Sequence, residues 1–269
     1  MLIEDLDDAT RKVAASFSER NPECDRAVGQ AFEQLGAAMQ ASHVNSTDRR
    51  QIAAVAFASR LLQVCHGAFE AIRSGNLITA QILVRSALEA LFALGGLSNQ
   101  RNFESGQDFY LRLLYKSKHS KQQALNRFLK NTTTLSPEDR VKGESKVNAL
   151  AQDLINIGQT PLTQVRDVSD AAGMLDMYAR DYALHSSPTH ADMEDVINTH
   201  VDIDDDKVIL KGLNVGNGNA KEACAHLVLV LMEGTVALER LFEITHAADH
   251  LAARESLSQF YGNALRASI

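Results

Sequence analysis

The chain has 269 residues, a formal net charge of −7 and a pI near 5.7, so it has no general attraction for nucleic acid. Hydrophobic residues make up 45% and charged residues 23%, which is typical of a globular protein with a sizeable core. Three cysteines without a CxxC pair, an N-terminus without signal-peptide order, and no apolar run longer than HLVLVLM predict a cytoplasmic protein with no membrane partner.

The apolar periodicity and the low proline count predict a series of long helices. They are expected near residues 2–19, 23–42, 48–73, 77–97, 102–130, 137–157, from 168 onward, and 220–246. Ser46 or Thr47 is expected to cap the third helix, Gly95–Gly96 to close the fourth, and Ser136 to cap the sixth. The amphipathic tail from residue 247 is expected to pack on a partner chain.

Two β-branched segments around an acidic turn, in VINTHVDIDDDKVILKG, predict one hairpin near residues 196–211. No repeat or linker divides the chain. The predicted fold class is therefore predominantly all-α, a multi-helix bundle with one small β-hairpin. It forms a single domain over residues 1–269, with an N-terminal helical pair (1–45), a core bundle (48–246) and a C-terminal helical tail (247–269).

An arginine and a glutamate interrupt the most apolar predicted helix. Arg85 and Glu89 are one turn apart and face the same way. A buried guanidinium must be paired, because an unpaired ion in the core costs several kcal/mol. Two interpretations stay open: a structural ion pair, or an arginine that binds an anion in a pocket and is oriented by Glu89.

The segment RDYALHSSPTH concentrates polar side chains in an Ala/Leu-rich chain. Arg180 and Asp181 precede His185 in a spacing that resembles the catalytic motif of the HEPN superfamily of helical ribonucleases. These act in toxin–antitoxin and phage-defence systems. The resemblance implies that Arg180 stabilises phosphorane charge while His185 or His190 moves protons. The loose Arg–His spacing recurs three times elsewhere in the chain, so the motif has low specificity.

A second register overlaps the first, because Tyr178, Tyr182, Ser186 and His190 recur every four residues. Such a stripe beside Arg85 and Glu89 would form a buried polar network. Together with the helix GNLITAQILVRSALEALF, it resembles a bacterial family, domain of unknown function 5677 (DUF5677), which implies an all-helical bundle. The resemblance covers residues 48–243 and implies as matching positions Gly75, Arg85, Glu89, Tyr178, Tyr182, Ser186 and His190.

The densest basic cluster is the candidate contact for a nucleic-acid backbone, and it consists of Arg112, Lys116, Lys118 and Lys121, with His119 between them. No HExxH motif or paired CxxC organises the histidines and acids, so we expect no metal site and no cofactor.

Two function classes follow. One is a metal-independent endoribonuclease with Arg180, Asp181, His185 and His190 as candidate catalytic residues. The other is a non-catalytic protein-interaction or accessory defence module with a structural Arg/Glu/Tyr/His network. We expect a homodimer, with RNA or a protein as partner.

Overall fold

The computed structural model describes residues 3–100, 102, 108–158, 162, 164–182, 201–204, 207–210, 220–245 and 248–266. These residues are predominantly helical, which confirms the predicted fold class at that level. The first half contains α1 (Ile3–Arg20), α2 (Pro22–Ala41), α3 (Arg49–Arg73), α4 (Leu77–Ser98) and α6 (Phe109–Asn131). The second half contains α7 (Pro137–Ile157), α8 (Val165–Ala172), α9 (Leu175–Met177), the π-helix η1 (Tyr178–Tyr182), α11 (Ala220–Phe242) and α12 (Ala248–Arg266).

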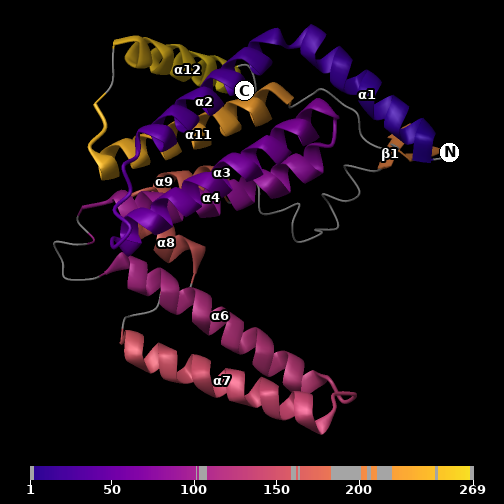
Figure 1. Ribbon diagram of the computed structural model, residues 1–269. Coiled ribbons are helices and arrows are strands. Elements are labelled where there is room, and N and C mark those ends of the chain that lie inside the picture. Colours follow the sequence, from indigo (N-terminus) through magenta and orange to yellow (C-terminus); the bar gives the residue numbers. More distant parts are fainter. Residues whose placement is uncertain are drawn as a thin grey trace.

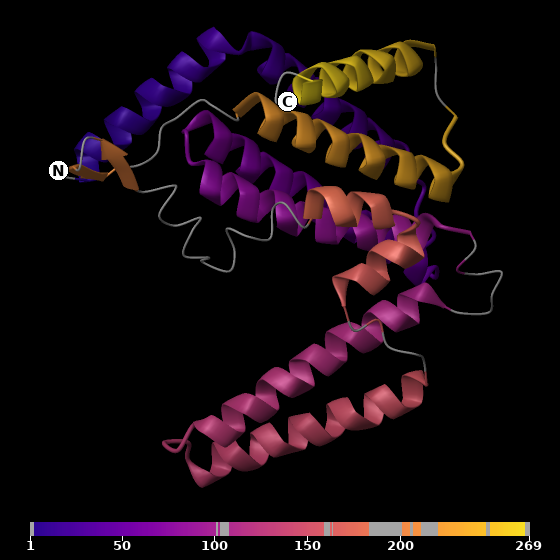
Figure 2. The same cartoon turned by 180° about the vertical axis from the view of Figure 1, so that it is seen from behind.

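The antiparallel pair α3 and α4 forms the centre of the bundle, with α2 and α11 packed along it and α12 on the outer side of α2 and α11 (Figure 1). Large side chains that are fully buried fill this centre, including Leu61, Leu88, Leu91, Phe92 and Leu227. The helices α6 and α7 form a hairpin that stands away from the bundle as an arm (Figure 2). The fold thus consists of a bundle and a projecting arm.

The turn between α3 and α4 explains why these two helices lie side by side. Ser74 caps α3, Gly75 has the left-handed φ of 76°, and the Asn76 side chain accepts a hydrogen bond from the N–H of Thr79 at 3.2 Å. At the N-terminal end of α3, the prediction of Ser46 or Thr47 as the N-cap is wrong. Asp48 is the N-cap, because its carboxylate accepts from two backbone N–H groups of the first turn.

The fourth helix continues past the glycine pair that was expected to end it. Gly95 and Gly96 lie inside α4, which runs to Ser98. Gly96 is required by a close approach, since a Cβ there would lie 2.1 Å from the ring of Phe109. Phe109 is the first residue of α6 and is fully buried. This contact therefore anchors the arm on the bundle.

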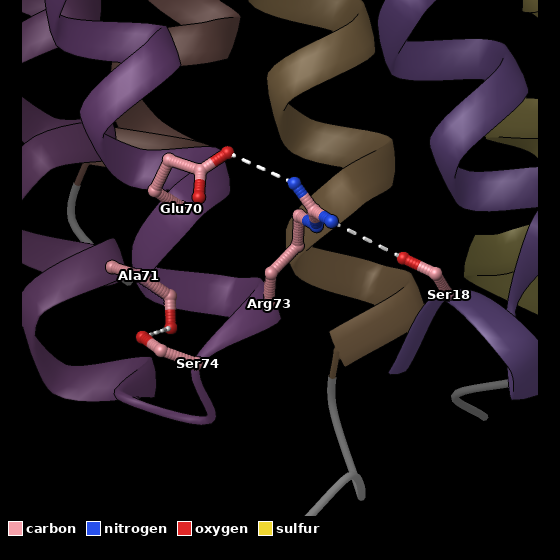
Figure 3. A network of polar contacts seen from close by, with 5 residues as sticks. All are labelled: Ser18, Glu70, Ala71, Arg73 and Ser74. Carbon is pink, nitrogen blue, oxygen red and sulfur yellow. Dashed lines mark hydrogen bonds and ion pairs between the residues drawn. The ribbon is translucent and has the colours of Figure 1, made fainter. Parts of the chain in front are cut away.

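Polar contacts of Arg73, the last residue of α3, join this helix to α1 (Figure 3). Arg73 donates from Nη1 to Glu70 Oε1 at 3.1 Å and from Nη2 to Ser18 Oγ at 3.4 Å. Its guanidinium also lies over the Phe69 ring, 5.9 Å from the centroid. Because Ser18 belongs to α1, these contacts hold the end of the first helix against the central pair.

The segment predicted as one helix from residue 168 is divided. It begins as α8 at Val165, stops at Gly173 with a φ of 73°, and resumes as α9 and η1. Further on, strands β1 (Val201–Asp204) and β2 (Lys207–Leu210) pair antiparallel, with Val201 opposite Leu210. The C-terminal helix α12 packs on α11 and α2 of its own chain, where Arg254 forms an ion pair with Glu239.

Among the described helices, α3 and α4 are long and apolar enough to cross a membrane by length and composition. Neither helix contains a long uninterrupted apolar run, because scattered polar residues interrupt both sequences. In the structure these two helices are the central pair of the bundle, a position that requires the same composition.

Candidate functional site

Six of the predicted site residues around η1 are described, and they come from two elements. Arg85 and Glu89 lie on α4, whereas Tyr178, Arg180, Asp181 and Tyr182 lie on η1. His185, Ser186 and His190 lie outside the described residues. The described part of the site is therefore the contact of η1 with the bundle.

The Tyr182 hydroxyl lies between the two charged residues of α4. It accepts a hydrogen bond from Arg85 Nε at 3.0 Å and donates one to Glu89 Oε1 at 2.8 Å. Arg85 Nε also lies 3.7 Å from Glu89 Oε1 as an ion pair. The side chains of Arg85 and Glu89 are 22% and 46% exposed, so the pair lies at the edge of the core. We call these three residues the Tyr182 cluster.

Aromatic packing holds the Tyr182 ring in place. The rings of Tyr178 and Tyr182 stack with centroids 5.1 Å apart and planes at 17°, and both lie against Phe92. The Arg85 guanidinium lies over the Tyr182 ring, 5.1 Å from its centroid. Burial, and to a smaller extent the hydrogen bond to Glu89, raises the pKa of Tyr182 to about 12. The hydroxyl therefore remains a protonated donor at neutral pH.

The residue before Tyr182 faces a different helix. Asp181 accepts two hydrogen bonds from Arg180, from Nε at 2.8 Å and from Nη2 at 2.9 Å, and its Oδ1 lies 3.6 Å from His226 Nε2 of α11. Burial alone would raise the pKa of Asp181, but His226 and Arg180 outweigh it and hold the pKa at about 2. The Asp181 side chain is 3% exposed and the Arg180 side chain 58%. Asp181 is thus a buried carboxylate that remains charged.

Sequence reasoning missed His226, although a signal was present. This histidine begins the run HLVLVLM on a helix that is buried over most of its length. A histidine in such a run needs a polar partner when buried. On α12, burial and, second, the charge of Asp181 raise the pKa of Tyr261. The η1 segment therefore contacts α4 through Tyr182 and α11 through Asp181.

Glu89 also lines a cleft of about 390 Å³ where α3, α4, α6 and α8 meet. Apolar side chains form part of its wall, and the polar lining consists of Arg60, Ser86, Glu89, Lys116, Ser117 and Ser120. Burial lowers the pKa of Lys116, while the charges of Glu89 and Asp167 oppose that effect. A cleft of this size, with apolar walls and charges of both signs, can hold a small polar group. Sequence reasoning did not place Arg60 in any site.

The four candidate nucleic-acid contacts do not form one surface. Arg112 and Lys116 are one turn apart on α6, but Lys118 turns toward α7, where it forms an ion pair with Asp153. Lys121 lies about 180° around the helix from Arg112. Within the described parts of the chain, no group of three or more His, Cys, Asp or Glu residues is placed to hold a metal ion.

The matched family is the Family of unknown function (DUF5677), whose model covers residues 51–208, more than half of the chain. The chain belongs to this family. The DUF5677 match contains α3 from Gln51 onward, α4, the arm and η1, and therefore both the Tyr182 cluster and the cleft. It ends at 208, earlier than the expected 243, and leaves α11 with His226 outside. No curated protein and no solved structure matches the chain.

Proposed function

We propose that the protein is a non-catalytic interaction module, in which the polar residues of η1 fasten this segment to the bundle. The observation that carries the proposal is the double attachment of η1. Tyr182 bonds the two charged residues of α4, while the neighbouring Asp181 is buried against His226 of α11. Consecutive side chains thus hold one segment between two helices.

The acid–base properties of these groups support a structural role. A general acid or base works best when its pKa lies near the working pH and its proton can reach the substrate. The pKa of Asp181 is about 2 and that of Tyr182 about 12, so neither group exchanges protons readily near neutrality. Asp181 is also too buried to contact an RNA strand. Both groups suit permanent hydrogen bonding.

Expression in a bacterial host tests the proposal. Wild type and the variants Arg180→Ala, His185→Ala and His190→Ala are induced, and growth and total RNA integrity are followed. We expect normal growth and intact RNA in all four cultures. Toxicity or RNA cleavage by the wild type, relieved by one of these substitutions without loss of thermal stability, would contradict the proposal.

A second candidate is a metal-independent, HEPN-like endoribonuclease of a toxin–antitoxin or phage-defence system, active as a cytoplasmic homodimer. The exposure of Arg180 favours it. The side chain is 58% exposed and directly precedes the stretch with the two histidines. Hydrogen bonding to Asp181 raises the pKa of Arg180 and outweighs the opposing effect of burial, so the guanidinium remains a cation. The same cultures test this candidate, which requires the toxic outcome.

A further inference from the structure

We propose that helix α6 binds single-stranded nucleic acid along one face, with its phosphates on a line of basic side chains and one nucleotide in the cleft at the base of the arm. The inference names a partner class for the proposed interaction module and rests on that function.

The charge of α6 differs from that of the rest of the chain. Of the 27 Lys and Arg residues, six lie on α6, and none of the 34 Asp and Glu residues does. They are Arg112, Lys116, Lys118, Lys121, Arg127 and Lys130. A protein with a net charge of −7 therefore concentrates positive charge on one helix. Such a local cluster attracts a polyanion even when the whole molecule does not.

The register arranges most of this charge in a line. Residues recurring every three or four positions share one face of a helix. On α6 such a line consists of Arg112, Lys116, His119, Gln123, Arg127 and Lys130, which we call the α6 stripe. With a rise of 1.5 Å per residue, it extends about 27 Å along the helix. Every member can donate a hydrogen bond to a phosphate oxygen.

The position of the arm leaves the outer part of the stripe accessible. The α6–α7 hairpin stands away from the bundle in both views (Figures 1 and 2). Gln123, Arg127 and Lys130 are exposed, and only Phe109 and Leu129 of α6 are buried. The ion pairs of α7 involve Lys118 and Lys142, which lie outside the stripe. The other helix of the arm therefore does not use the stripe for its own pairing.

Aromatic rings and the cleft favour a single strand over a duplex. Tyr115 stacks on His119, with centroids 6.0 Å apart and planes at 28°. The cleft contains Lys116 of the stripe together with Phe57 and Arg60 of α3. Proteins that bind single strands combine a basic track with aromatic side chains on which bases stack. In a duplex the base faces are covered by their neighbours.

Glu89 determines how a nucleotide enters the cleft. Its carboxylate repels a phosphate, but it can accept hydrogen bonds from a ribose hydroxyl or a base amino group. The phosphate then lies toward Arg60 and Lys116. A partly buried cation such as Lys116, whose pKa burial lowers, is further stabilised by such an anion. The cleft therefore suits a nucleotide better than inorganic phosphate alone.

Fluorescence anisotropy of the full chain with 5′-labelled oligonucleotides tests the inference. The probes are a 15-nucleotide oligouridine, an oligodeoxythymidine of the same length, a 15-base-pair duplex and a labelled polyglutamate peptide, at several salt concentrations. The stripe variant is Arg127→Gln/Lys130→Gln. The matched control is Lys121→Gln/Lys146→Gln, which removes the same charge from exposed positions of the arm outside the stripe. Thermal unfolding verifies that each variant is folded.

We expect wild type to bind the single strands, and the stripe variant to lose about tenfold in affinity while the control loses less than about twofold. The slope of log K against log salt should fall by about 1.4 in the stripe variant, since each lost phosphate contact contributes about 0.7 for single strands. A preference for oligouridine or oligodeoxythymidine identifies the sugar, and equal binding assigns recognition to the phosphates and bases.

Equal losses in both variants, or no binding of either single strand, would overturn the inference. Tighter binding of the duplex would reject the single-strand assignment, and tighter binding of polyglutamate would point to an acidic protein instead. Gel analysis of the oligouridine after incubation separates this result from the proposed function. Cleaved RNA contradicts a non-catalytic module, whereas intact and unbound RNA contradicts only the binding inference.

Discussion

Replacing Tyr182 by Phe removes one oxygen atom from the centre of the candidate site. The aromatic ring, its stacking on Tyr178 and its contact with the Arg85 guanidinium are retained. What is lost is the hydrogen bond from Arg85 Nε at 3.0 Å and the one to Glu89 Oε1 at 2.8 Å. The substitution therefore isolates the polar contribution of the Tyr182 cluster.

The magnitude follows from the charge and exposure of the two partners. A hydrogen bond to a charged group contributes about 1.5–3 kcal/mol when it is well shielded from water. Arg85 and Glu89 are 22% and 46% exposed, so water replaces part of what they lose. We therefore expect Tyr182→Phe to lower the free energy of unfolding by roughly 1–2 kcal/mol, which lowers Tm by roughly 4 °C in a chain of this size.

Tyr178→Phe is the matched control, because no described residue hydrogen-bonds the Tyr178 hydroxyl while both rings belong to the same stack. We expect a change below about 0.5 kcal/mol for this variant. Urea unfolding of wild type, both single variants, Glu89→Gln and the double variant Tyr182→Phe/Glu89→Gln gives the coupling energy. Equal stability of the two Tyr→Phe variants, or zero coupling, would refute the structural interpretation of the cluster.

Two further predictions concern contacts that position the arm and η1. Gly96→Ala should destabilise the fold by roughly 1–3 kcal/mol in urea unfolding, because the added Cβ meets the buried Phe109 ring. The control Gly36→Ala on α2 should be neutral or stabilising, since no atom lies within 4 Å of a Cβ at that position. Asp181→Asn should lower stability at neutral pH by about 2 kcal/mol, the equivalent of a carboxyl pKa of about 2 in place of the ordinary 3.8. Because the pKa of Asp181 is lowered by folding, this contribution is present above pH 4 and disappears as the pH falls toward 2. Unfolding curves at several pH values should therefore show the stabilities of wild type and Asp181→Asn converging in acid. A stability difference that does not change with pH would contradict the lowered pKa of Asp181.

Most helices of the fold could be predicted because their signals are local. Ser136 and Pro137 start α7 where the sequence places them, since an N-cap acts on the N–H groups of its own first turn. The Gly95–Gly96 pair was misread for the opposite reason. Glycine permits both a helix end and a close approach of another residue. The residue that approaches Gly96 is Phe109, on the first helix of the arm. Sequence periodicity does not contain that contact.

The candidate site could be predicted only in part. The four-residue spacing places Tyr178 and Tyr182 on the same side of η1, where their rings stack, and Tyr182 bonds both Arg85 and Glu89. The π-helical geometry of η1 could not be anticipated, because the same spacing fits an α-helix. The members of the predicted basic cluster face different ways, because adjacency in sequence is not adjacency on a helix. Lys118 turns to α7, while the α6 stripe continues to Arg127 and Lys130.

The two overlapping registers of the polar segment have separate roles on η1. The tyrosine register faces α4, where Tyr182 contacts the Arg85–Glu89 ion pair. In the Arg180 register, the carboxylate of Asp181 points inward to His226 on α11. An arginine that stabilises a phosphorane must be able to leave its ground-state partner, and Arg180 would have to give up two hydrogen bonds to a buried carboxylate. Among the described residues, that carboxylate would then have only His226 as a basic partner, at a distance of 3.6 Å. Catalysis by Arg180 would therefore weaken the attachment of the segment that presents it.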